Sequence, residues 1–169
     1  MPIIRPDTPH SEAPPVLIRP VRLHEAHAVA QVHVQADRET YAPIFGASFR
    51  EVAFERSLQR WQTALAAGDV FLAAEAEARI VGFAHSTDTW MSALYLLAPH
   101  VRQGIGSRLV EAVRSELRAR GVREVGFTAV AQNAGALAFY AAMGAQPVER
   151  RWEGEGAEAW ENIDFVLPI

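Results

Sequence analysis

The chain has 169 residues, of which half are hydrophobic and 21% are charged, and its formal net charge is −4. This length and composition are typical of one soluble domain. The mild acidity offers no basic surface for nucleic acid, and the absence of cysteine excludes disulfides, thiolate metal sites and a cysteine nucleophile.

The first fifteen residues carry five prolines, mostly separated by polar residues. Proline removes main-chain donors and opposes helix, so we expect residues 1–15 to be a flexible tail and residues 16–169 to form a single domain. No basic segment followed by an apolar run opens the chain, and no apolar stretch is long enough to span a bilayer. We therefore expect a cytoplasmic protein with no membrane partner.

Hydrophobic periodicity predicts an alternation of strands and helices along the rest of the chain. In chain order we expect a strand at 16–21, helices at 24–38 and from 54 to about 68, strands at 70–74, 80–86 and 93–97, a helix at 104–120, a strand at 125–129, a helix at 133–143, and strands at 148–152 and 160–167. The strand–helix–strand unit between 93 and 129 predicts a parallel crossover, and the hairpins predict antiparallel pairing. The expected fold class is α/β (α+β), with a mixed, mostly antiparallel central sheet of about seven strands and about four flanking helices.

A glycine-bearing turn joins the strand at 93–97 to the longest amphipathic helix, in the sequence Ala98-Pro-His-Val-Arg-Gln-Gly-Ile-Gly-Ser107. Such a turn exposes main-chain N–H groups at the positive end of a helix dipole, where phosphate oxygens bind readily. Gly104 and Gly106 would let an anion approach the backbone closely. A purely structural glycine corner is the alternative interpretation. A dinucleotide fingerprint fails because Leu109 stands where a third glycine is required, and a Walker loop fails because no lysine is present.

A second motif lies in the segment Asn133-Ala-Gly-Ala-Leu-Ala-Phe-Tyr-Ala-Ala-Met-Gly144, directly after the strand at 125–129. By itself it is a short helix with Asn133 as its N-cap and Gly144 as its stop. Together, the two segments resemble the GNAT (general N-acetyltransferase) superfamily, whose patterns are Gln/Arg-x-x-Gly-x-Gly/Ala and Asn-x-x-Ala-x-x-Phe-Tyr-x-x-x-Gly. One position departs from the first pattern, because Val101 stands at the Gln/Arg position.

This resemblance implies a fold in which the fourth and fifth strands splay apart and an N-acetyltransferase that uses acetyl-CoA as co-substrate and needs no metal. The pantetheine arm would pair with the fourth strand through the backbone of Leu94, Leu96 and Ala98. Asn133 and Tyr140 would also contact the coenzyme. The pyrophosphate would lie in the loop formed by Val101, Arg102, Gln103, Gly104, Ile105, Gly106 and Ser107. Charge from Arg102 or Arg108 could compensate for Val101.

The reaction implied by the resemblance is direct attack of an amine on the thioester, without a covalent enzyme intermediate. Tyr140 would be the general acid that protonates the departing sulfur. For the general base, Glu39, His85 and a chain of water molecules stay open. His24, His27 and His33 share one helix without a metal-binding arrangement, and we expect them at the surface.

Aromatic residues indicate where the amine would bind, because they suit an apolar or aromatic acceptor. The expected pocket residues are Tyr41, Phe45, Trp90 and Trp160. The acceptor could be a small molecule or a peptide amine, and the acyl group could be longer than acetyl. Family members are often dimers, so the resemblance allows a homodimer. Two other functions stay open: a non-catalytic acyl-CoA sensor on the same fold, and a protein-interaction module.

Overall fold

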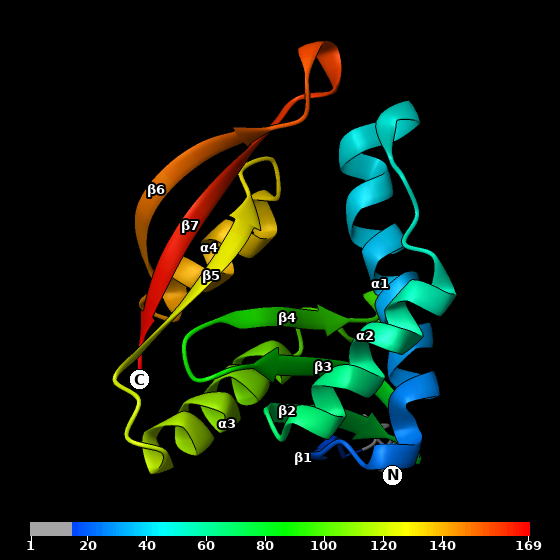
Figure 1. The fold of residues 1–169 in the computed structure, drawn as a ribbon, viewed down its shortest axis with the longest axis vertical. Coiled ribbons are helices and arrows are strands. Elements are labelled where there is room, and N and C mark those ends of the chain that lie inside the picture. The colour runs from blue at the N-terminus through cyan, green and yellow to red at the C-terminus, as the bar shows by residue number, and fades with distance from the viewer. Residues whose placement is uncertain (1–14) are drawn as a thin grey trace, which may run out of the picture.

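Strands and helices follow one another in the order that the sequence predicts (Figure 1). The computed structural model describes residues 15–169, so the predicted tail of residues 1–15 lies, apart from Pro15, outside the described residues. The helices are α1 (Ala26–Phe45), α2 (Phe54–Ala67), α3 (Ile105–Ala119) and α4 (Ala134–Ala142). The strands are β1 (Leu17–Pro20), β2 (Val70–Ala76), β3 (Arg79–Ser86), β4 (Met91–Leu96), β5 (Glu124–Val130), β6 (Gln146–Glu153) and β7 (Trp160–Pro168).

The strands form two antiparallel sheets. The first has the order β1-β2-β3-β4 and the second has the order β5-β7-β6. In the described chain one parallel bridge, from Trp90 to Gly126, joins the two sheets, and beyond it β4 and β5 diverge (Figure 1). The predicted mostly antiparallel architecture with splayed fourth and fifth strands is therefore confirmed. The divergence leaves one edge of β4 without a partner strand.

Helices cover both faces of the first sheet. On one face α1 and α2 enclose an aromatic core that includes Trp61, Phe71 and Phe83. On the other face α3 buries Leu109, Val113 and Leu117, which recur at helical spacing. This second core continues under the β5-β7-β6 sheet without interruption. Both sheets are consequently anchored to one body of packed side chains, and the gap between β4 and β5 is fixed in place.

Helix α1 is longer than the sequence predicts. It continues past the expected end at residue 38 to Phe45, with Pro43 in its last turns and Gly46 at a φ of 53° after its end. Proline lacks the N–H that would bond the carbonyl four residues earlier, and α1 continues past Pro43 for only two more residues. Tyr41 and Phe45, expected in a loop, therefore lie on a helix.

His33 corrects a second expectation, because its side chain is buried and not at the surface. Its Nδ1 lies 2.7 Å from the Ser57 hydroxyl, and the Trp61 indole donates to the same nitrogen at 3.2 Å. Both partners lie on α2. A histidine on α1 therefore ties the two helices together inside the core.

Candidate functional site

A cavity of about 600 Å³ lies where β4 and β5 diverge. This volume is within the range of small-molecule sites in proteins. Its walls come from the end of α1, from β4 and β5, from the loop before α3 and from α4. The lining residues are Thr40, Tyr41, Leu94, Tyr95, Leu96, Val101, Arg102, Gly104, Gly106, Ser107, Thr128, Ala129, Asn133, Gly135, Ala136, Phe139 and Tyr140.

The loop before α3 presents a row of free main-chain donors to this cavity. Within residues 15–169, the N–H groups of residues 102–107 make no hydrogen bond, and the first helical bond from this region is from the Arg108 N–H to the Gly104 carbonyl at 3.1 Å. Gly104 adopts a φ of 78°, which turns the chain into the helix. The free donors and the positive end of the α3 dipole favour an anion here.

The open edge of β4 supplies a second set of main-chain groups. The Leu97 N–H donates to the Val81 carbonyl on β3 at 2.9 Å. Because alternate residues of a strand direct their N–H groups to opposite edges, those of Leu94 and Leu96 face the gap. This is the arrangement that an extended ligand needs in order to pair with the strand.

Ala98, the third residue expected to pair with the pantetheine arm, already has a partner for its N–H. Its N–H donates to the Glu39 carboxylate at 2.7 Å, and Ala98 does not line the cavity. The other carboxylate oxygen of Glu39 accepts from the Gln35 side chain at 2.9 Å. Glu39, a candidate general base, thus connects α1 to the loop after β4 through this hydrogen bond.

The remaining loop residues divide between cavity and scaffold. Val101, Arg102 and Ser107 line the cavity. Ile105 is buried in the core, and the Gln103 side chain donates to the Pro99 carbonyl at 2.7 Å. Arg108, considered as a compensating charge, points elsewhere and donates to the Val16 carbonyl at 2.7 Å. Arg102 is therefore the loop arginine that the structure brings to the site.

Helix α4 contributes both of its predicted residues. The Asn133 side chain accepts from the Ala136 N–H at 3.1 Å, which caps the helix. The Tyr140 ring packs against Phe127 at a centroid distance of 4.2 Å. In the described chain its hydroxyl makes no hydrogen bond, so it is available to a ligand. Burial, with a smaller contribution from Tyr41, raises the pKa of Tyr140, and the phenol is protonated at neutral pH.

A second cavity of about 340 Å³ adjoins the first at Tyr41, which lines both. Phe45 and Trp160 meet across it with ring centroids 5.8 Å apart. Arg50 and Glu158 form an ion pair of 3.5 Å at its exposed rim. The lining residues are Asp37, Tyr41, Phe45, Ser48, Phe49, Arg50, Val52, Val130, Glu158 and Trp160.

Trp90 lines neither cavity, although the sequence analysis placed it with the other aromatics. Trp90 takes part in the bridge to Gly126, where the two sheets meet, and its ring packs against that glycine. Three of the four predicted pocket residues are thus brought together, and the fourth lies where the two sheets meet.

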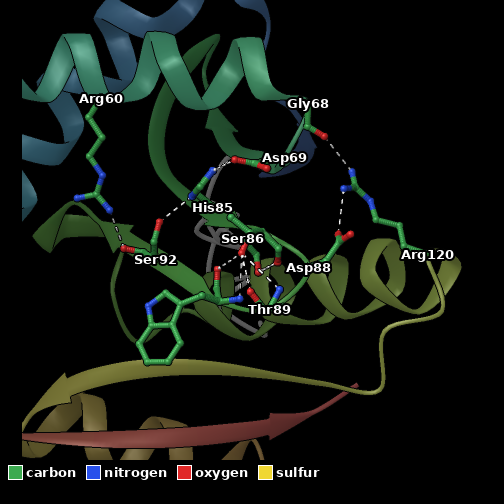
Figure 2. A network of polar contacts seen from close by, with 11 residues as sticks. Arg60, Gly68, Asp69, His85, Ser86, Asp88, Thr89, Ser92 and Arg120 are labelled. Carbon is green, nitrogen blue, oxygen red and sulfur yellow. Dashed lines mark hydrogen bonds and ion pairs between the residues drawn. The ribbon is translucent and has the colours of Figure 1, made fainter.

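His85 belongs to a polar network beside the first sheet and lines neither cavity (Figure 2). Its Nε2 lies 3.0 Å from the Asp69 carboxylate and its Nδ1 lies 2.7 Å from the Ser92 hydroxyl. Arg60 donates to the Ser92 carbonyl at 3.2 Å on the other side of the network. Burial lowers the pKa of His85. The structure gives this imidazole structural partners and does not bring it to the gap.

Several lining residues were not predicted from the sequence, and two of them, Asp37 and Tyr95, carry polar groups that contact each other. Asp37 on α1 lines the smaller cavity, and Tyr95 on β4 lines the larger one. The spacing between Asp37 and Tyr41 is one helical turn, which places both on one face of a helix. That signal was hidden because the helix was expected to end at residue 38.

Two features are absent from residues 15–169. Histidine, aspartate and glutamate side chains form no group of three arranged to hold a metal ion. Among the helices described, none combines the length and the hydropathy needed to cross a bilayer.

The sequence model of the acetyltransferase (GNAT) family matches residues 34–145. This range contains every residue that lines the larger cavity. The chain belongs to the acetyltransferase (GNAT) family. The membership predicted from the two glycine-bearing motifs is therefore confirmed, and the protein is an acetyltransferase. A comparison with curated protein sequences gives no significant match.

Solved structures of GNAT proteins share this fold at low sequence identity. One is the structure of yncA from Salmonella typhimurium with acetyl-CoA, which has 18% sequence identity and a TM-score of 0.74 and covers 91% of this chain and 94% of that chain. Another is a ribosomal-protein-alanine N-acetyltransferase from Brucella melitensis, which has 21% identity and a TM-score of 0.73 and covers 90% of this chain and 99% of that chain. A phosphinothricin acetyltransferase from Sinorhizobium meliloti with acetyl-CoA is similar too (14%, 91% and 88%, 0.72). At these identities the likeness shows the fold.

Proposed function

We propose that the protein transfers an acetyl group from acetyl-CoA to a primary amine by direct attack in a ternary complex. The observation that carries this proposal is the larger cavity, which joins the free N–H groups before α3 to the open edge of β4. The exposed main-chain groups along this cavity suit a ligand that has a phosphate group at one end and an extended chain with amide groups at the other. Two of the compared structures contain acetyl-CoA, which supports the same ligand here.

The loop before α3 would hold the diphosphate of the coenzyme. A side chain at Gly106 would have its Cβ 3.4 Å from the Phe139 ring and would fill the space beside the helix N-terminus. With glycine there, phosphate oxygens can reach the free N–H groups of residues 102–107. Arg102 adds a positive charge on the same wall.

The pantetheine amides would pair with the open edge of β4, at Leu94 and Leu96. This pairing would bring the thioester to the part of the cavity that Tyr140 lines. The N–H of Leu96 would donate to the carbonyl oxygen as negative charge develops on it, which is worth most in a site that excludes water.

The reaction forms a C–N bond and breaks the C–S bond of the thioester. The acceptor ammonium first loses a proton, and the neutral amine then attacks the carbonyl carbon. As the bond to sulfur breaks, the Tyr140 hydroxyl gives its proton to the sulfur. The tyrosinate then takes the remaining proton from the new amide nitrogen, so the products are the acetamide, CoA and one proton released to solvent.

Replacing Tyr140 with phenylalanine tests this assignment. We expect kcat to fall about tenfold or more while KM for acetyl-CoA changes little, because the phenol acts in the transition state and is not needed to hold the coenzyme. Steady-state release of CoA measures kcat, and urea denaturation of the variant checks that the fold is intact. An unchanged kcat would remove Tyr140 from the mechanism.

One residue favours the alternative of a non-catalytic acyl-CoA sensor. Val101, which is 43% exposed, stands where the family pattern has Gln or Arg. Thermal unfolding with and without acetyl-CoA, followed by turnover assays over a broad panel of amines, separates the functions. We expect acetyl-CoA to raise Tm, as any ligand of the native state does, and at least one amine to be acetylated. A raised Tm without turnover would favour the sensor, and an unchanged Tm would contradict both.

A further inference from the structure

We propose that Asp37 binds the ammonium group of the acceptor and takes its proton, and that this acceptor is a monoamine with an apolar, ring-sized body. This inference rests on the proposed function and deepens it, because it names the general base and the substrate class. Four features of the smaller cavity carry it.

The first feature is the carboxylate itself. Asp37 is 9% exposed and lines the smaller cavity. Within the part of the chain that the structure describes, its side chain accepts one hydrogen bond, from the Tyr95 hydroxyl at 3.5 Å, and forms no ion pair. A bond of this length is weak, so a nearly buried carboxylate is left without a strong donor. A cationic ligand in the cavity would supply one.

The second feature is the position of Asp37 between the two cavities. Tyr41 lines both of them, and Tyr95 lines the larger one while donating to Asp37. Tyr41 lies one helical turn after Asp37 on α1, and burial together with the negative charge of Asp37 raises the pKa of Tyr41. An ammonium group at Asp37 therefore stands at the entrance to the cavity proposed for the thioester.

The third feature is the pairing of the other charges in the smaller cavity. Its remaining charged lining residues, Arg50 and Glu158, neutralise each other at the rim. Arg50 also donates to the carbonyl groups of Ala47 and Phe49. A carboxylate or a second ammonium of the substrate would have to compete with this pair for Arg50 or Glu158. This favours a monoamine over amino acids and polyamines.

The fourth feature is the apolar wall. Phe45, Phe49 and Trp160 face a cavity of about 340 Å³, which is near the lower end of the range for ligand sites. A ring attached to the amine through a short chain would fill this space and bury apolar surface. A long flexible substrate would leave the walls partly exposed to water.

The proton balance fits this placement. The ammonium gives one proton to a carboxylate oxygen of Asp37, the neutral amine attacks the thioester, and Asp37 later releases that proton to solvent. Burial raises the pKa of the Asp37 carboxyl, the hydrogen bond from Tyr95 opposes the rise, and the negative charge of Glu51 adds to it. A raised pKa makes the carboxylate a stronger base than an exposed aspartate. The charged groups around it are Arg50, Glu51 and Glu158.

The test compares Asp37→Asn with Glu51→Gln, a nearby carboxylate that lines neither cavity. With 2-phenylethylamine as acceptor, we expect Asp37→Asn to lower kcat/KM by about 100-fold or more, as loss of a general base does. Glu51→Gln should stay within about threefold, and both variants should bind acetyl-CoA as the unmodified protein does. For the unmodified protein, kcat/KM should be at least about tenfold higher with 2-phenylethylamine than with phenylalanine or 1,5-diaminopentane.

A binding measurement keeps this inference separate from the proposed function. With coenzyme A bound, so that no reaction occurs, calorimetry should show 2-phenylethylamine binding to the unmodified protein and at least about tenfold weaker binding to Asp37→Asn. Equal binding, equal kcat/KM or a preference for the diamine would overturn the inference. Amine binding at Asp37 with no turnover of any amine would instead overturn the proposed function and leave the ammonium site standing.

Discussion

Two glycines at the start of α3, Gly104 and Gly106, serve different physical purposes. Gly104 has a φ of 78° and nothing near the position of a Cβ, so its role is to turn the chain. Gly106 lies within α3, where any residue fits the backbone, and its role is to leave space in the cavity. Gly104 therefore sets the conformation of the loop, and Gly106 lines the cavity where we propose that the diphosphate binds.

Alanine substitutions separate these roles. We expect Gly104→Ala to lower the free energy of unfolding by about 1 kcal/mol, because a Cβ disfavours the left-handed conformation. Gly106→Ala should leave the free energy of unfolding unchanged or raise it slightly, because alanine favours helix. The same substitution should weaken acetyl-CoA binding about tenfold. Urea denaturation and calorimetry measure the two effects. Normal acetyl-CoA affinity in Gly106→Ala would contradict the proposed diphosphate site.

Among the elements, β4 has two functions, since it is the last strand of the first sheet and a wall of the larger cavity. Its position depends on Gly82 in β3, which lies opposite Leu96. A Cβ at Gly82 would lie 2.7 Å from the Tyr95 carbonyl oxygen and would also overlap Leu96 Cδ2. The backbone oxygen cannot move without shifting the strand.

Gly82→Ala should therefore destabilise the protein by about 2 kcal/mol and also weaken acetyl-CoA binding, because β4 must shift to accept the methyl group. Gly126→Ala is the matched control. Its Cβ would meet the ring of Trp90 at 2.6 Å, but that side chain is 40% exposed and can turn away. Urea denaturation and calorimetry compare the variants. If Gly82→Ala matched the control in both measurements, β3 would not set the position of β4.

At the scale of the whole molecule, the stability of the chain depends on histidines buried without charge. Burial, together with the positive charge of Arg60, lowers the pKa of His33 from 6.5 to about 4. Protonation would also cost His33 the acceptor nitrogen that meets Ser57 and Trp61. Between pH 6.5 and about 4, His33 is therefore protonated in the unfolded chain and neutral in the folded chain.

Above pH 6.5 protonation of His33 should not affect the free energy of unfolding. As the pH falls from 6.5 toward 4, the free energy of unfolding should decrease by up to about 3 kcal/mol. Urea denaturation at pH 7.0, 5.5 and 4.5 measures this. His33→Gln should show a shallower decline, with a residual slope from His85, whose pKa burial also lowers. Glu25 acts below this range, because its pair with Arg19 holds its pKa at about 2. Equal slopes in the variant and the unmodified protein would exclude His33 as the cause.

Local sequence signals predicted the order of the elements, the glycine-bearing turn around Gly104 and Gly106, the Asn133 cap of α4 and the position of Tyr140 on that helix. These features depend on local physics: hydrophobic periodicity, turn residues and the free donors of a helix start act over a few neighbouring residues. Local signals were weaker where Pro43 and Gly46 hid the last turns of α1.

Packing between distant segments determines which polar side chains face the gap. Asp37 and Tyr95 are 58 residues apart, Glu39 and Ala98 are 59 apart, and His85 and Asp69 are 16 apart. No local pattern indicates such meetings, because they depend on how helices and sheets pack as rigid bodies. Packing gave Glu39 and His85 polar partners away from the gap and placed the Asp37 carboxylate in the smaller cavity, next to the larger one at Tyr41.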